Sequence, residues 1–196
     1  MLEIVITIIG IVQGILAMLN KRVNWLVYAL QMALLVAFSY YNKLYGDMTQ
    51  NAIYFFICIA SWYAWKDGNI ADKIRMMNNM QRVAATVVIL VFTFLGWLVL
   101  SGTDDPMPWT DSFTTITTFA ALGLMMYRCV ETWVVWFVND IAYMYQYFNL
   151  PDQALYLFGL YVIWTVMAIA SFINWYRLYE KDYDPIADAH RRHCGN

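Results

Sequence analysis

Charged and structure-breaking residues are scarce in this chain of 196 residues. Only 13% of the residues are charged, whereas soluble domains carry about 25%, and the chain has only four prolines. Together with 62% hydrophobic residues, this composition excludes an ordinary soluble protein and is typical of an integral membrane protein. The apolar sequence extends along the whole chain and leaves no room for a separate soluble domain.

The few cysteines and histidines exclude several kinds of site. Cys58, Cys129 and Cys194 are widely spaced, so the sequence offers neither a disulfide framework nor a metal-binding pattern. His190 and His193 lie in the polar C-terminal stretch DAHRRHCGN, away from the apolar runs. Because those runs also lack paired carboxylates, we expect no metal, no cofactor and no membrane enzyme. Besides a membrane enzyme, the other alternative to a ligand-binding membrane protein is a purely structural or channel-like protein.

Long apolar runs recur along the chain, and each is close to the length of about 20 residues that a helix needs to cross a bilayer. The first run lacks a basic start and a small-residue cleavage site, so we expect it to be a helix rather than a removable signal peptide. We predict an all-α integral membrane protein with seven transmembrane helices. Their expected positions are about 3–19, 24–41, 48–65, 83–101, 109–127, 131–148 and 153–176.

Lysines and arginines are distributed unevenly between the two ends of these helices. One side carries only Lys43, whereas the alternate loops and the C-terminal tail carry the other eleven of the twelve basic residues. Because cytoplasmic loops are enriched in Lys and Arg, we predict that the N-terminus lies outside the cell (inner) membrane and the C-terminus in the cytoplasm. This bias also favours an odd number of spans.

An internal repeat relates the two halves of the chain. QNAIYFFICIASW at 50–62 and DQALYLFGLYVIW at 152–164 align at a constant offset, and NWLVYALQ at 24–31 is weakly similar to TWVVWFVN at 132–139. A single intervening helix gives both triplets of helices the same orientation, as in parallel-repeat transporters, whose substrate site lies between the halves.

We therefore divide the chain into four parts. They are a first three-helix repeat (1–66), a connecting segment with the fourth helix (67–108), a second three-helix repeat (109–176) and a cytoplasmic tail (177–196).

The stretch ETWVVWFVND at 131–140 is unusually polar for a membrane helix. Trp133, Trp136 and Asp140 are spaced i, i+3, i+7 and so share one face of a helix. An ionisable residue within a span costs roughly 2.5–3.5 kcal/mol on insertion scales and normally faces the bundle interior or a wet cavity. The alternative is a helix end with interfacial tryptophans, but Asp140 lies about two to three turns deeper than Glu131.

Other predicted helices carry similar stripes of aromatic and polar residues, which together predict a central cavity with flat aromatic faces, amides and one carboxylate. Such faces attract a delocalised cation by about 0.5–2 kcal/mol each, so we expect a flat, cationic solute. The candidate substrate-binding residues are Trp133, Trp136, Asn139, Asp140, Trp25, Tyr28, Gln31, Asn51, Tyr54, Cys58, Trp62, Gln153, Tyr156 and Trp164.

Three segments resemble the Pnu vitamin transporter family and occur in the family's order. They are LYGDMTQNAIYFF and SWYAWK within 44–66, PWTDSF at 108–113, and RCVETWVVWFVND at 128–140. The resemblance implies seven helices in a three-plus-one-plus-three, parallel-repeat arrangement similar to that of SWEET proteins, and a homotrimer. It also implies facilitated diffusion of a water-soluble B-type vitamin, which a cytoplasmic kinase then traps by phosphorylation.

The residues that depart from the family pattern leave the vitamin open. Trp133 and Trp136 match the tryptophan pair that the family places beside its substrate. Asp140 and Gln31 stand where riboside transporters often have Asn, and Cys58 stands where an amide is frequent. The resemblance implies nicotinamide riboside or thiamine, both of which carry a cationic ring. Riboflavin is third, because a neutral vitamin gains nothing from Asp140.

Overall fold

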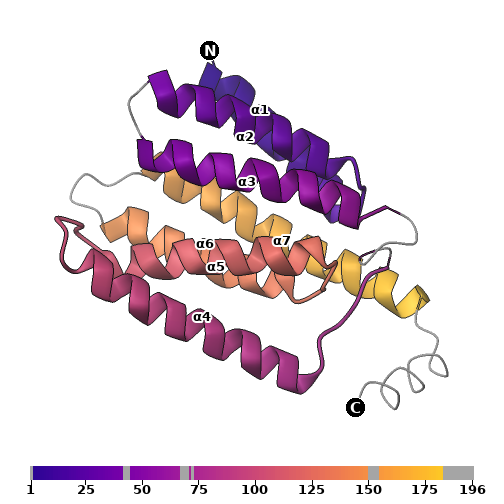
Figure 1. Cartoon of the computed structure of the whole chain (residues 1–196). Helices are drawn as coiled ribbons and strands as arrows, with labels where there is room; N and C mark the ends of the chain where they lie inside the picture. The colour runs from indigo at the N-terminus through magenta and orange to yellow at the C-terminus, as the bar shows by residue number, and fades with distance from the viewer. Residues whose placement is uncertain (1, 42–44, 67–70, 72, 150–154, 183–196) are drawn as a thin grey trace.

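The chain forms a bundle of α-helices in a computed structural model that describes residues 2–41, 45–66, 71, 73–149 and 155–182. The seven helices of these residues confirm the predicted number, although the last helix continues to Asp182, past the predicted end at residue 176 (Figure 1). They are α1 Leu2–Met18, α2 Asn24–Tyr41, α3 Tyr45–Ala64, α4 Asn79–Leu100, α5 Pro108–Met126, α6 Thr132–Asn149 and α7 Leu155–Asp182.

The outward faces of the helices are apolar. Thr93 is the one buried residue of α4, and most of the helix presents exposed hydrophobic side chains such as Val99, which is 72% exposed. Helix α4 and residues 158–181 of α7 are long and apolar enough to cross a membrane, and residues 5–18 and 24–38 form shorter apolar helices. Side chains of this kind over such lengths are stable in lipid rather than in water.

Helix α5 carries many hydroxyl groups and turns them inward. Ser112, Thr114, Thr117 and Thr118 are all buried, and the hydroxyl of Ser112 donates a 2.8 Å hydrogen bond to the carbonyl of Thr93 on α4. An unsatisfied polar group in hydrocarbon costs several kcal/mol. Internal hydrogen bonds therefore allow this polar helix to lie between α4 and α6, both of which it contacts.

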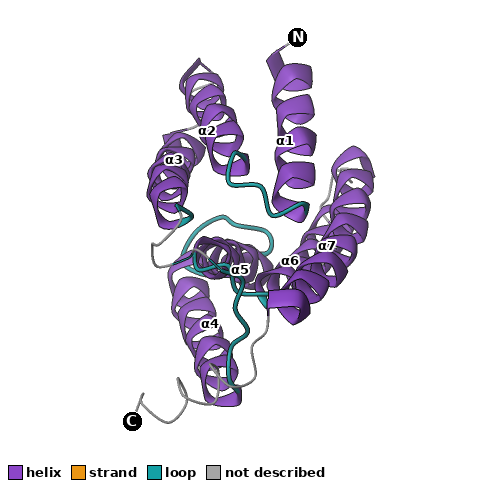
Figure 2. Cartoon of the chain, turned by 90° about the vertical axis from the view of Figure 1, so that its right-hand side faces the viewer, coloured by secondary structure: helices purple, strands orange, loops and turns teal. Residues whose placement is uncertain are grey.

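Two groups of helices, α1 to α3 and α5 to α7, face each other across the bundle. Helix α1 contacts both α2 and α7, α2 packs on α3, and α6 packs on α7. A further contact joins α3 to α5, and α4 lies at the edge of the bundle that is farthest from α1 and α2 (Figure 2). The first three helices thus meet the last three along α1 with α7 and along α3 with α5. The three-plus-one-plus-three repeat itself stays a prediction.

Basic segments from both groups lie at one end of the bundle, which we call the basic end (Figure 1). The guanidinium of Arg22 lies 3.8 Å from the ring centroid of Trp62, and its Nε donates to the Trp62 carbonyl at 2.7 Å. The main chain of Arg75 pairs with the loop between α5 and α6, donating to Arg128 and accepting from Val130 at 2.9 Å each. Segments that the sequence assigns to one side of the membrane therefore lie at the same end.

Candidate functional site

A cavity of about 270 Å³ lies between the two groups of helices. Residues of α1, α2, α5, α6 and α7 line it, so neither group forms it alone. Six of the predicted site residues are among them: Tyr28, Gln31, Trp133, Trp136, Asp140 and Trp164. The lining residues that the sequence analysis did not select are Gln13, Gly14, Ala17, Met32, Met125, Tyr161, Met167, Ala168 and Ser171.

Helix α6 supplies one wall of this cavity through the predicted stripe of Trp133, Trp136 and Asp140. Trp133 and Asp140 are buried, and Trp136 is half-buried. Within the described part of the chain, the carboxyl group of Asp140 forms neither a hydrogen bond nor an ion pair. A buried carboxylate without a protein partner is costly, so this group favours a cationic or hydrogen-bonding ligand in the cavity.

Amide side chains supply further polar groups to the cavity. Gln31 on α2 donates a long hydrogen bond of 3.4 Å from Nε2 to the carbonyl of Ile6 on α1. Gln13 on α1 is buried and also lines the cavity. Each amide carries both donors and an acceptor. The cavity can therefore hold a flat cation between indole faces and form hydrogen bonds with its polar substituents.

Helix α7 forms a wall that sequence reasoning found only in part. Trp164 was predicted, but Tyr161, Ala168 and Ser171 were not. Tyr161 stacks on Tyr143 of α6 with ring centroids 4.5 Å apart, which joins the two helices beside the cavity. Positions 161, 164, 168 and 171 follow the spacing of one helix face, and this spacing was the signal that could have found them.

Asn139 was predicted to bind substrate, but it faces α5 instead of the cavity. Its side chain is fully buried, accepts a 2.6 Å hydrogen bond from Thr117 and donates to Thr118 at 3.3 Å. Neighbouring residues of a helix point about 100° apart, so Asn139 and Asp140 face different partners. In this structure Asn139 joins α6 to α5.

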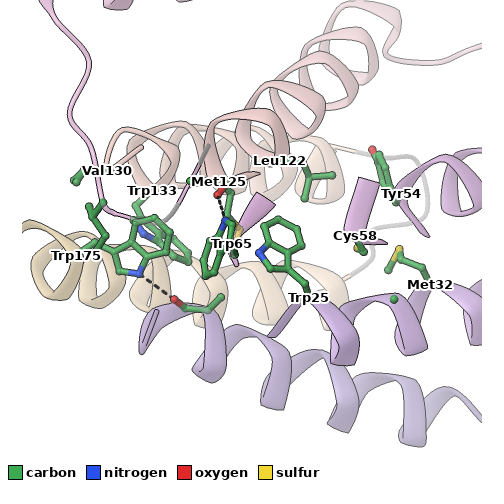
Figure 3. Close-up of a cluster of buried hydrophobic side chains, with 14 residues drawn as sticks. Trp25, Met32, Tyr54, Cys58, Trp65, Leu122, Met125, Val130, Trp133 and Trp175 are labelled. Carbon is green, nitrogen blue, oxygen red and sulfur yellow. Dashed lines mark hydrogen bonds between the residues drawn. The ribbon is translucent and has the colours of Figure 1, made fainter. Parts of the chain in front are cut away.

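Three further predicted residues lie in the hydrophobic core and do not line the cavity. Trp25 is fully buried and packs edge-on against Trp65, with ring centroids 5.4 Å apart. Cys58 is also fully buried (Figure 3). The ring of Tyr54 packs against Phe119 of α5, with ring centroids 5.1 Å apart. Tyr54 and Cys58 of α3 therefore belong to the core that packs the two groups of helices together.

Two other predicted residues, Asn51 and Trp62, are not among the residues that line the cavity. Asn51 is half-buried on α3, and Trp62 lies under the guanidinium of Arg22 at the basic end. Gln153 lies outside the described residues, as does the side chain of Tyr156. The repeat paired Trp62 with Trp164, but Trp62 lies in the last turn of α3, whereas Trp164 lies in the first half of the longer α7.

Four tryptophans form a continuous cluster at the basic end of the cavity (Figure 3). This tryptophan cluster consists of Trp25, Trp65, Trp133 and Trp175. The ring centroids are 5.4 Å apart for Trp25 and Trp65, 5.7 Å for Trp65 and Trp175, and 5.3 Å for Trp175 and Trp133. The Trp175 indole donates to the carbonyl of Ala17 on α1 at 2.9 Å, and the Trp65 indole donates to α5. The cluster therefore joins the two groups of helices where the cavity ends.

Comparisons with known proteins agree with this architecture. Residues 1–177 match the family described as nicotinamide mononucleotide transporter. A nicotinamide riboside transporter PnuC of Neisseria mucosa is 24% identical over 192 residues, which cover 88% of this chain and 72% of that protein. A crystal structure of the vitamin B3 transporter PnuC has a TM-score of 0.74 and 24% identity, and the match covers 93% of this chain and 83% of that one.

The solved structure confirms the all-helical fold, and the family match confirms the resemblance seen in the sequence. The relatives are named as transporters, in agreement with the prediction that the chain is not an enzyme. The chain is a membrane transporter and belongs to the nicotinamide mononucleotide transporter family.

Proposed function

We propose that this protein carries nicotinamide riboside into the cytoplasm and that the cavity between the two groups of helices is its binding site. The observation that carries this proposal is the carboxyl group of Asp140, which faces an indole-lined cavity and has no ion-pair partner among the described residues. The nicotinamide ring of the riboside is flat and positively charged, so it can stack on Trp133 or Trp136 while Asp140 neutralises it. The PnuC relatives are named as transporters of nicotinamide riboside and of vitamin B3, which supports the same substrate.

The size of the cavity supports a small vitamin. Its volume of about 270 Å³ is close to the lower limit of roughly 300 Å³ for ligand pockets. A riboside with one aromatic ring fits this volume better than riboflavin, which has three fused rings. Gln13 and Gln31 can bond to the carboxamide and ribose hydroxyls.

Thiamine is the second candidate, because the pairing of Asp140 with indole faces suits any flat cation. Thiamine carries its charge on a thiazolium ring and adds a second aromatic ring, which requires more room. Riboflavin transport by the same scaffold is the third candidate and makes no use of the carboxylate.

Ligand-dependent thermal unfolding of the purified protein tests these candidates. A ligand that binds only the folded state raises the unfolding temperature, by an amount that increases with the logarithm of its concentration divided by its dissociation constant. We expect nicotinamide riboside to give the largest shift. Its neutral dihydro form, which has the same outline without the charge, is the control and should give a smaller one. A larger shift with thiamine or riboflavin would reassign the substrate, and no shift with any of the three would refute the proposed site.

We further propose that transport is facilitated diffusion and that phosphorylation by a cytoplasmic kinase traps the vitamin. Asp140 is the one acidic residue among those that line the cavity, so the site offers no chain of carboxylates for a coupling ion. In liposomes without a membrane potential, uptake should stop at equal concentrations on both sides. Accumulation that depends on an imposed proton or sodium gradient under these conditions would contradict a passive mechanism.

The orientation and assembly are also proposals. The clustering of basic segments at one end of the bundle supports a cytoplasmic C-terminus in the inner membrane. A C-terminal reporter that is active only in the cytoplasm should be active, and activity of a reporter specific for the outside would reverse the orientation. The family resemblance supports a homotrimer, which the native mass of the purified protein tests.

A further inference from the structure

We propose that Gly10 and Gly14 of α1 are positioning residues, which hold Gln31 and Trp164 in the cavity wall by leaving space for their side chains. This inference concerns the cavity that the proposed function uses as its substrate site. Gly10 and Gly14 lie one turn apart on the same face of α1, which contacts both α2 and α7. Gly10 thus faces Gln31 from the first group of helices, and Gly14 faces Trp164 from the second group.

Gly14 allows the indole of Trp164 to lie directly against α1. A Cβ atom at residue 14 would lie 2.7 Å from Cζ3 of Trp164 and 2.8 Å from Cε of Met167, closer than real Cβ atoms approach other atoms. The terminal methyl group of Met167 can rotate away, but Cζ3 belongs to a rigid ring. A methyl group at residue 14 must therefore push the indole or separate α1 from α7.

Gly10 has the same relation to the amide of Gln31. A Cβ atom there would lie 2.5 Å from Nε2 of Gln31 and 3.3 Å from its Cδ. This amide also donates to the carbonyl of Ile6, one turn earlier on α1. The space at Gly10 and the acceptor at Ile6 together fix the amide against α1. A methyl group at residue 10 would displace the amide, which can rotate more freely than an indole.

Two other helix glycines in the bundle lack such a contact and so provide controls. Gly123 of α5 and Gly159 of α7 also lie within helices, but a Cβ atom at either would have no neighbour within 4 Å among the described residues. Glycine is less favourable than alanine in a helix interior, so replacement at an open position should favour the helix. A loss at residue 14 must therefore come from the contact with α7.

The test compares four glycine-to-alanine variants of the full-length protein. We expect Gly14→Ala to weaken the binding of nicotinamide riboside about tenfold or more, which is the scale of a displaced aromatic wall. Gly10→Ala should weaken it less, because the amide of Gln31 can move. Gly123→Ala and Gly159→Ala are the matched controls and should stay within about twofold of the parent protein. Equal effects of Gly14→Ala and Gly159→Ala would overturn the inference.

A double-mutant cycle separates positioning from a general disturbance of the bundle. Trp164→Phe removes the fused ring that the added methyl group would meet. Gly14→Ala should therefore have little further effect on binding in the Trp164→Phe background. Similarly, Gly10→Ala should have little effect once Gln31 is replaced by Ala. Full additivity in either cycle would refute the corresponding contact.

Thermal unfolding without ligand keeps the inference testable if the proposed substrate is wrong. Gly14→Ala should lower the unfolding temperature when Trp164 is present and leave it unchanged or higher in the Trp164→Phe background. If this pattern is found but no vitamin binds, the proposed function is refuted and the role of Gly14 is retained. Absence of the pattern would refute the role of Gly14, whatever the protein transports.

Discussion

Replacement of Asp140 by Asn removes the charge from the cavity and keeps the shape of the side chain. Two unit charges about 4 Å apart interact by about 4 kcal/mol at an effective dielectric constant of about 20. The charge of a nicotinamide ring is spread over several atoms, so its mean distance is larger. Part of the attraction also replaces the hydration that the cation has in water. We therefore expect Asp140→Asn to weaken cation binding by about 1–3 kcal/mol.

This loss corresponds to about 5- to 150-fold in the dissociation constant, which calorimetry on the purified protein can resolve. The neutral dihydro form of the riboside should lose much less affinity, because its shape is unchanged and its charge is absent. Glu180→Gln is a suitable control, because it removes one negative charge from an exposed position near the basic end of α7. Equal losses for the charged and neutral ligands would refute the electrostatic role of Asp140.

Three other outcomes follow from the structure. Trp136→Ala should weaken binding by about 1–3 kcal/mol with little change in the unfolding temperature. Trp133→Ala should lower both the affinity and the unfolding temperature, because Trp133 also belongs to the tryptophan cluster. Calorimetry and thermal unfolding distinguish the two variants. Asn139→Ala should reduce stability by about 1–3 kcal/mol without weakening binding by the folded protein, since it removes the two buried hydrogen bonds that join α6 to Thr117 and Thr118 of α5. Burial, with a smaller contribution from Glu131, raises the pKa of the Cys129 thiol to about 11. In a variant without the other cysteines, alkylation should accelerate up to about that pH, and a rate that levels off near the ordinary thiol pKa of about 8.5 would contradict this.

The positions of the helices could be predicted because lipid imposes a length of about 20 apolar residues on each helix. The end of α7 could not. Its last residues, including Arg177, Glu180 and Lys181, are charged and were assigned to a cytoplasmic tail, but they continue the helix. A helix needs an apolar surface only where it crosses lipid, so a loss of hydropathy marks the edge of the bilayer and not the end of the helix.

Part of the candidate site could be predicted, because the residues concerned share one face of a single helix. Trp133, Trp136 and Asp140 were found together because their spacing fixes a common face. The structure places Tyr54 and Cys58 in the hydrophobic core. This placement could not be predicted, because periodicity shows which residues share a face and does not show which helix that face meets. The residues of α1 were not predicted either. Its glycines act through the space that they leave for side chains distant in sequence, and periodicity does not show this space.

Three hydrogen bonds at the basic end constrain the identity of the donor residue but not that of the acceptor residue. The indoles of Trp65 and Trp175 and the amide of Asn174 donate to the carbonyls of Met126, Ala17 and Met18, respectively. These carbonyls lie at the C-terminal ends of α5 and α1, where helices leave backbone acceptors without intrahelical partners. Every amino acid supplies such a carbonyl, so evolution is free to change the acceptor residues within limits of size. The three donors carry the whole chemical requirement, and their loss would remove the side-chain hydrogen bonds from the ends of two helices at once.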